Sequence, residues 1–101
     1  MTQIHFHEGF YTPIKEGIKT QTARVGEPVY PLGKAEAIFS DNKSLPIEIT
    51  KVSHKTFNQL SKKEAEKDGF QSKQELWNIL LKFYPKLEKT DILMLVEFRC
   101  I

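Results

Sequence analysis

Apolar and polar residues alternate in several short stretches of the chain, and this pattern predicts β-strands. Apolar positions within residues 4–10 bracket an opening strand, and a second strand is expected over residues 35–39. A polar turn at residues 41–44 separates this second strand from a third around residues 47–52, so the two should pair as a hairpin. The aliphatic run at residues 92–98 predicts a buried strand.

Between residues 61 and 85 the spacing of apolar residues changes to that of helices. Ser61 and Ser72 are each followed three positions later by a glutamate, which is the pattern of a capping box. The first box predicts a short helix that ends near Gly69, and the second predicts a longer helix that Pro85 stops. Four apolar residues of the longer helix are spaced to form one stripe that faces the core. They are Leu76, Ile79, Leu80 and Phe83.

The remaining elements complete a mixed fold. A short helix is expected at Pro13 with Gly17 as its end, and the paired threonines of residues 19–24 favour an extended segment. The order is therefore strand, helix, about three strands, two helices and a strand. We predict an α+β fold with a small, mixed, barrel-like sheet and flanking helices, because closure of the sheet satisfies its edges. The length suits a single domain over residues 1–101.

Composition and charge limit the class of protein, of ligand and of cellular compartment that we expect. Hydrophobic residues make up 40% and charged residues 28% of the chain, which is ordinary for a globular protein. The net charge of +2 is too small for a dedicated duplex binder and fits a small anionic or nucleoside ligand better. The start has no signal-peptide pattern and no apolar run is long enough to span a membrane, so we expect a cytoplasmic protein with no membrane partner. Cys100 is the only cysteine and is interpreted as a small apolar residue beside the last strand.

The strongest candidates for catalytic residues lie in the segment Gly-Ile-Lys-Thr-Gln-Thr-Ala-Arg, residues 17–24. A lysine with its usual pKa of about 10.4 is no base at neutral pH, but burial or a nearby cation lowers that value. A neutral Lys19 would then accept a proton from the hydroxyl of Thr22 or from a water molecule, the minimal form of an activated nucleophile. Arg24, with its fixed set of donors, or backbone N–H groups would bind a carbonyl or an oxyanion.

Two considerations weigh against this interpretation. Threonine, lysine and arginine are all common on strands, so the spacing alone is weak evidence. Residues 19 and 22 of a regular strand also point to opposite faces. Both can meet one substrate only if Lys19 lies in the turn before the strand, which Gly17 favours, or if a bulge intervenes.

Other candidates are weaker. His5 and His7, followed by Glu8, resemble a metal-ligand pair, but no third ligand stands at a useful spacing, and we expect no metal. Trp77 and Tyr84 flank the apolar stripe, and we interpret both as packing residues rather than as ligand-stacking residues.

The glycine-lysine-arginine framework resembles the signature of ASCH domains, usually Gly-x-Lys-x-x-Glu-x-Arg, which are relatives of the RNA-binding PUA fold. The resemblance extends over almost the whole chain and includes residues 65–72, residues 83–85 and the terminal Val-Glu-Phe-Arg-Cys-Ile. Thr22 stands where the family usually has glutamate. In this residue and in its closing segment the chain is similar to the bacterial N(4)-acetylcytidine amidohydrolases.

This resemblance implies a catalytic lysine, threonine and acidic residue. Lys19 and Thr22 match the first two, Asp68 is the best match for the acid, and Arg24 would bind substrate. The relatives have glutamate in place of Asp68, and Glu66 is an alternative acid two residues earlier. Two arrangements are open for Asp68, namely a buried protonated acid or an ion pair with Lys19.

The implied reaction is removal of the acetyl group from N(4)-acetylcytidine, or from a related acylated cytosine nucleoside, to give cytidine and acetate without a cofactor. Thr22 would either be acylated or position the attacking water. The substrate could be a base, a nucleoside or RNA, and the sequence leaves the oligomeric state open. The alternative functions are an RNA-binding module without chemistry and a ribonuclease.

Overall fold

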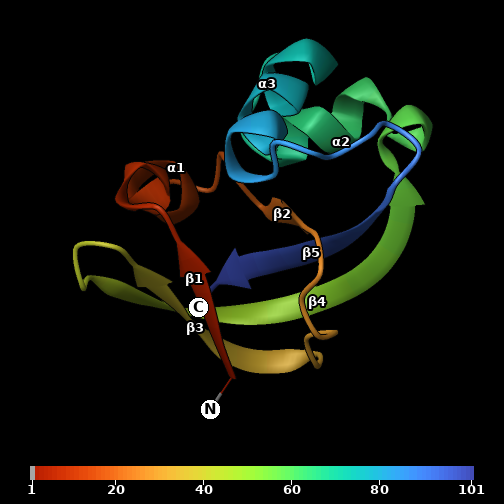
Figure 1. The fold of residues 1–101 in the computed structure, drawn as a ribbon. Coiled ribbons are helices and arrows are strands. Elements are labelled where there is room, and N and C mark those ends of the chain that lie inside the picture. Colours follow the sequence, from red (N-terminus) through yellow and green to blue (C-terminus); the bar gives the residue numbers. More distant parts are fainter. Residues whose placement is uncertain (1) are drawn as a thin grey trace.

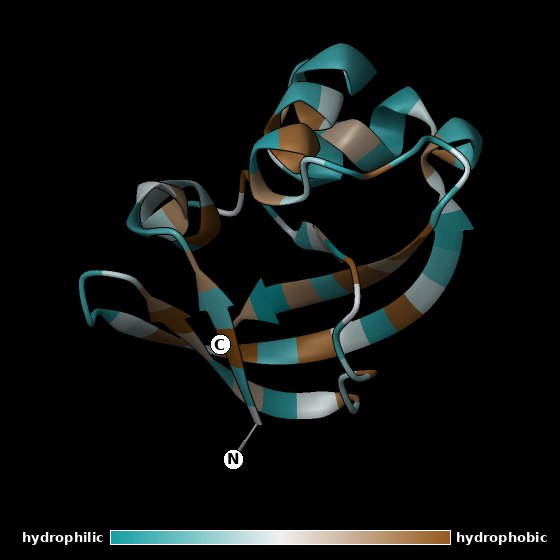
Figure 2. Ribbon diagram, viewed as in Figure 1, coloured by the Kyte–Doolittle hydropathy of each residue, from teal (hydrophilic) through white to brown (hydrophobic). Residues whose placement is uncertain are grey.

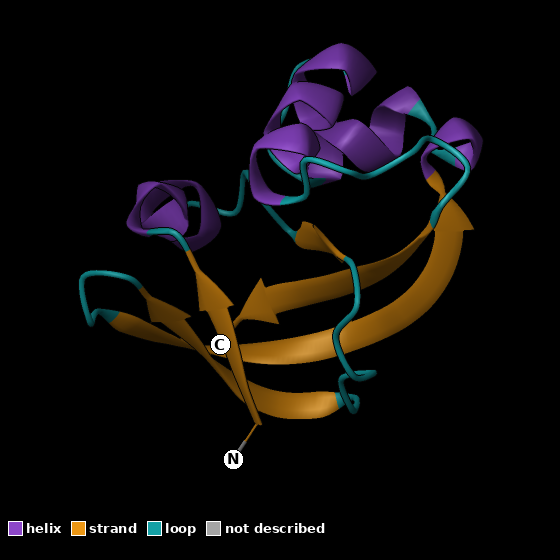
Figure 3. Cartoon of the chain, in the orientation of Figure 1, coloured by secondary structure: helices purple, strands orange, loops and turns teal. Residues whose placement is uncertain are grey.

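The computed structural model describes residues 2–101, which form one five-stranded sheet with short helices packed against it (Figures 1 and 3). The sheet has the order β1-β3-β4-β5-β2 and curls into a half-barrel. β1 runs parallel to β3, and the other pairs are antiparallel. The predicted α+β fold and the hairpin are thus confirmed. The strands are β1 (Thr2–Phe6), β2 (Gln21–Arg24), β3 (Gly33–Phe39), β4 (Ser44–Thr56) and β5 (Ile92–Cys100).

The helices begin where the capping residues predicted. The α-helices are α1 (Tyr11–Lys15), α2 (Lys62–Lys67) and α3 (Lys73–Phe83), and two short 3-10 turns span Glu8–Phe10 and Phe57–Gln59. Ser61 caps α2 in a reciprocal capping box, whereas the side chain of Ser72 accepts a hydrogen bond from the third residue of α3 without the reciprocal bond. Both predicted helix starts are confirmed.

β4 is much longer than the expected strand around residues 47–52. It has 13 residues, and its pairing with β5 shifts between Ile49 and Lys51. Such a bulge breaks the alternation of faces and bends the strand, so the apolar pattern stops before the strand does. The bend lets β4 follow the curl of the sheet (Figure 1).

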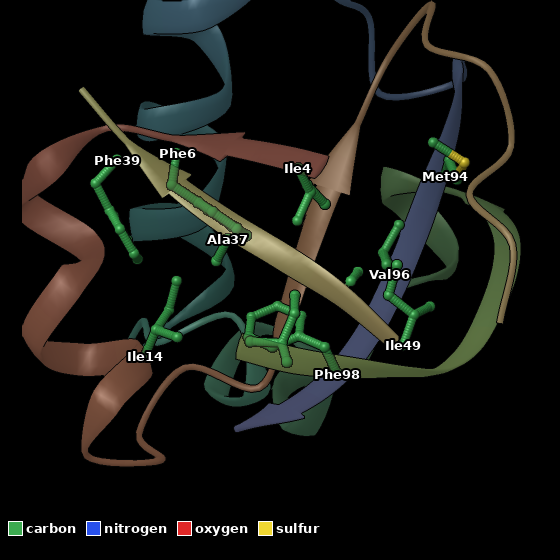
Figure 4. Packing of buried hydrophobic residues seen from close by; sticks show 11 residues of the cluster. Ile4, Phe6, Ile14, Ala37, Phe39, Ile49, Met94, Val96 and Phe98 are labelled. Atoms are coloured by element: carbon green, nitrogen blue, oxygen red, sulfur yellow. The ribbon is translucent and has the colours of Figure 1, made fainter. Parts of the chain in front are cut away.

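Apolar side chains form two clusters on either side of β5. Alternate residues along this strand face different clusters: Met94, Val96 and Phe98 pack inside the half-barrel, and Leu93 and Leu95 pack against the helices. Burial on both faces explains why β5 reads as a continuous apolar run, in contrast to the alternating strands (Figure 2). Figure 4 shows the first cluster, in which Ile14 of α1 covers side chains of β1, β3 and β5.

Two side chains, those of Phe83 and Cys100, lie differently from the prediction. Phe83 does not face the core: it is 54% exposed, because it is the last residue of α3 and extends beyond the core that Leu76 and Leu80 enter. Cys100 is exposed at the end of β5 rather than packed, and its Sγ lies 3.3 Å from the carbonyl oxygen of Ile14, to which it donates. In residues 2–101, no helix has the length and apolarity needed to cross a membrane.

Candidate active site

A cavity of about 260 Å³ opens between the edge strands of the sheet and α3. The side chains of Lys19, Thr22, Arg24 and Asp68 all line it, so the structure brings together the four residues singled out from the sequence. Their roles in chemistry stay a prediction, but they share one space.

Local backbone geometry explains how Lys19 and Thr22 reach the same cavity although they are three positions apart. Lys19 lies in the turn before β2, after Gly17 has adopted a φ of 77°. The backbone N–H groups of Ile18 and Lys19 both donate to the carbonyl oxygen of Pro13, at 2.9 and 3.0 Å. This turn frees Lys19 from the alternation of the strand and lets its side chain enter the same cavity as that of Thr22.

Lys19 and Asp68 form a buried ion pair. Lys19 Nζ donates to Asp68 Oδ1 at 2.7 Å and to the carbonyl oxygen of Asp68 at 2.8 Å, and both side chains are only 3% exposed. The rings of Phe10 and Phe70 lie 4.8 and 5.6 Å from Nζ. Burial lowers the pKa of Lys19; the carboxylate of Asp68 opposes this effect, and Arg24 adds to it. The structure therefore has the ion-paired arrangement of Asp68.

The end of α2 fixes the position of this acid. Asp68 is the C-cap of the helix, and the following residue, Gly69, has a φ of 96°. A Cβ at Gly69 would lie 3.3 Å from the Cβ of Lys19, so glycine serves both the turn and the close approach of the two segments. Glu66, the alternative acid, is exposed and does not line the cavity.

Thr22 is held by Arg24 on the same strand. Arg24 Nε donates to Thr22 Oγ1 at 3.1 Å, and Nη2 donates to the carbonyl oxygen of His5 at 2.6 Å. The guanidinium also lies over the ring of Phe6, 4.8 Å from its centroid. In this arrangement Arg24 orients the Thr22 hydroxyl and links the two edge strands of the sheet, β1 and β2.

Two further polar residues support Arg24 and were missed in the sequence. Glu27 Oε2 accepts from Arg24 Nη1 at 3.4 Å, and Tyr30 donates its hydroxyl hydrogen to Glu27. Burial and the neighbouring Glu27 raise the pKa of Tyr30 to about 12. Both residues lie in the loop between β2 and β3, where the sequence offered only turn signals.

Gln21 was also missed, although it is among the most buried polar residues. It is 1% exposed, and its Nε2 donates to Asp68 Oδ2 and to the carbonyl oxygen of Glu64, both at 3.1 Å. A glutamine within a strand carries no functional signal by itself, because only the approach of α2 supplies its partners.

Apolar and aromatic side chains form the rest of the cavity wall. Trp77 and Tyr84 both pack against the second apolar cluster, as expected. Trp77 lies on Phe57 with ring centroids 4.7 Å apart, and Tyr84 also lines the cavity wall. His5 and His7 also line the cavity. Within residues 2–101, no three His, Cys, Asp or Glu side chains are grouped so that they could hold a metal ion. The apolar part of the wall includes Phe70, Leu76, Ile79, Leu80 and Phe83.

Comparison with known proteins identifies one family across the chain. The family model described as the ASCH domain matches residues 3–101. No curated protein matches the sequence significantly.

Solved structures share the fold. An ASCH domain from Lactobacillus crispatus JV V101 is 21% identical and superposes with a TM-score of 0.81, over 98% of this chain and 78% of that one. The hypothetical protein PH0355 is 21% identical with a TM-score of 0.75, over 98% and 97%. A DUF984 protein from Enterococcus faecalis V583 is 17% identical with a TM-score of 0.71, over 89% and 65%. At these identities the likeness establishes the fold.

Proposed function

Because the chain belongs to the ASCH domain family, we propose that it is an amidohydrolase that removes the acetyl group of N(4)-acetylcytidine, or of a related acylated cytosine nucleoside. The products are cytidine and acetate. The observation that carries this proposal is the buried Lys19–Asp68 pair, which shares one cavity with the hydroxyl of Thr22.

The pair supplies both the base and the acid that amide hydrolysis requires. Transfer of one proton from Lys19 Nζ to Asp68 Oδ1, over 2.7 Å, gives a neutral amine and a carboxylic acid. Burial favours this neutral state because it lowers the pKa of Lys19. The amine then accepts a proton from the attacking oxygen, and the acid provides a proton for the departing amino nitrogen of cytosine.

Thr22 provides the attacking oxygen in one route and positions a water molecule in the other. In the first route Oγ1 bonds to the acetyl carbon, the C–N bond breaks, cytidine leaves with the bonding electrons and a proton from Asp68, and water then releases acetate from the threonine ester. In the second route the water attacks directly. Arg24 donates to Oγ1 and thereby stabilises negative charge on it as its proton is lost.

The cavity wall suits an acylated nucleobase. Its polar part holds the amide, and the aromatic and aliphatic side chains next to it offer flat apolar surfaces for a planar base. Arg24 already donates to Thr22, to Glu27 and to the His5 carbonyl, so we assign the oxyanion of the tetrahedral intermediate to backbone N–H groups.

The decisive experiment incubates the purified protein with N(4)-acetylcytidine and follows cytidine and acetate. We expect hydrolysis by the unmodified protein and by Glu66→Ala, and a loss of about 10²–10⁴ in turnover for Asp68→Ala, because removal of a general acid or base has an effect of this size. Glu66 is the matched control, since it is an exposed acid near the end of the same helix.

An inactive unmodified protein would overturn the proposal. If that protein instead binds oligonucleotides with a steep dependence on salt, the chain is an RNA-binding module. Cleavage of single-stranded RNA would make it a ribonuclease. If Asp68→Ala remains active, the assignment of the acid is wrong. Intact mass measured during turnover distinguishes an acetylated Thr22 from direct attack by water.

A further inference from the structure

The Lys19–Asp68 pair has a third partner that does not reach the cavity. Gln21 is nearly fully buried between β2 and the end of α2 and does not line the cavity. Its two amide hydrogens are both used, one by Asp68 Oδ2 and one by the carbonyl oxygen of Glu64, at 3.1 Å each. Gln21 is thus anchored on one side by the helix backbone and binds the acid on the other.

Two residues donate the three hydrogen bonds that the side chain and the backbone carbonyl of Asp68 accept. Oδ1 and the backbone carbonyl accept from Lys19, and Oδ2 accepts from Gln21. Rotation of the carboxylate would break both side-chain bonds, so the amide of Gln21 keeps Oδ1 directed at Lys19. A donor on Oδ2 also stabilises the ionised carboxylate but not a proton on that oxygen, which leaves Oδ1 as the place where a shared proton resides.

We propose that Gln21 is a positioning residue that fixes the Asp68 carboxylate and sets the proton affinity of the Lys19–Asp68 pair. The kinetic part of this proposal rests on the proposed amidohydrolase function, whereas the part that concerns proton affinity does not. Gln21 acts through Asp68 and touches no substrate, because it lies outside the cavity wall.

One other charged group and several titratable groups lie near the pair and must be held constant in any test. Arg24 of β2 is close enough to lower the pKa of Lys19. His5 and His7, on β1 and the turn after it, and Tyr84, after α3, line the same cavity. A change confined to Gln21 leaves all of these groups in place.

The first measurement uses the unmodified protein, labelled with ¹³C and ¹⁵N, without substrate. NMR follows Asp68 Cγ and the side-chain N–H groups of Gln21 as the pH is lowered. We expect both signals to change with the same midpoint, because protonation of the carboxylate alters the hydrogen bond that Gln21 donates. A Gln21 side-chain signal that does not respond where Asp68 Cγ titrates would overturn the proposal.

The second measurement compares Gln21→Met with Gln74→Met, which makes the same substitution at an exposed site on α3. Methionine has a similar size but no donor. In Gln21→Met the midpoint of the pair should rise by about one pH unit, the size expected for loss of a hydrogen bond to a charged group. An unchanged midpoint in a folded Gln21→Met protein would overturn the proposal. If that variant does not fold, the unmodified protein alone gives the answer.

Kinetics with N(4)-acetylcytidine separates positioning from packing. We expect Gln21→Met to lower kcat by about 10-fold with KM unchanged, because the acid and base are misaligned while the cavity wall is intact. A rise in KM with unchanged kcat would contradict the positioning role. An inactive unmodified protein would refute the proposed function and leave the NMR test of Gln21 valid.

Discussion

Two polar clusters lie on either side of Thr22, and they differ in burial and in how they are assembled. The inner cluster consists of Lys19, Gln21 and Asp68, all of them no more than 3% exposed. The outer cluster consists of Arg24, Glu27 and Tyr30, which are half-buried. The inner cluster joins two segments that are 49 positions apart, whereas the outer one forms within a single strand and loop.

This difference separates two kinds of electrostatic control. Charges in the inner cluster are removed from water, so their interactions are strong and their protonation depends on each other. Charges in the outer cluster are partly screened by solvent, so each contact contributes less. We therefore assign proton transfer to the inner cluster and the orientation of Thr22 to the outer one.

The largest effect is expected when one partner of the inner pair is removed. Lys19→Met should destabilise the fold by about 3–5 kcal/mol, because it leaves the buried carboxylate of Asp68 without its cation, and it should also abolish turnover. Urea unfolding and an assay with N(4)-acetylcytidine measure the two effects.

The double variant Lys19→Met with Asp68→Leu is the control. It should regain part of the lost stability without regaining activity, since apolar side chains can replace a buried ion pair but leave one amide hydrogen of Gln21 without its acceptor. A double variant as unstable as the single one would show that the pair's charge is not what makes the single substitution costly.

An intermediate effect is expected at Arg24, the centre of the outer cluster. Arg24→Gln should lower turnover by about 10- to 100-fold, because Thr22 Oγ1 loses a charged donor. Urea unfolding should show a smaller loss of stability than for Lys19→Met. Arg99→Gln is the matched control, since Arg99 is an exposed arginine that also binds a glutamate. If Arg24→Gln costs as much stability as Lys19→Met, the two clusters do not differ as described.

The smallest effect is expected at Tyr30. Its pKa is raised to about 12 in the folded protein, so the fold favours the neutral phenol. The resulting contribution to stability is complete below pH 10 and is lost as the pH rises towards 12. Tyr30→Phe should remove this dependence, with a change of less than about 1 kcal/mol because solvent screens the site. Urea unfolding at pH 9 and pH 11 measures it. If Tyr30→Phe loses stability just as steeply between pH 9 and pH 11, groups other than Tyr30 cause that loss.

The sequence predicted the elements well where local chemistry defines them. Capping serines located α2 and α3, and the continuous apolar run located β5, because a cap and a strand buried on both faces are both visible in a few consecutive residues. Lys19, Thr22 and Arg24 were singled out for the same reason, because they lie within six consecutive residues, and the structure places all three at one cavity. The turn at Gly17 was correctly expected to free Lys19 from strand parity.

The rest of the site depends on contacts that a local pattern does not contain. Asp68 was singled out only through the family resemblance, and Gln21 not at all, because their meeting depends on where α2 docks against the turn before β2. Phe83 fits the helical stripe by its spacing, but α3 ends there and directs it to the cavity. The spacing of apolar residues predicts which face of a helix is buried, but it does not predict how far along the helix the core extends.

The position of β5 in the sheet also determines when the site can form during folding. Among the described residues, β2 has its ladder with β5 alone, with Gln21 opposite Glu97. The chain between β2 and β5 forms a long loop, and closing this loop costs conformational entropy before any contact compensates for it. Folds with such distant pairings form slowly. A growing chain therefore exposes the segment of Lys19 and Thr22 long before its partner strand is synthesised. The reaction proposed at Thr22 therefore requires almost the whole chain, and a nascent or truncated form that lacks β5 is expected to be inactive.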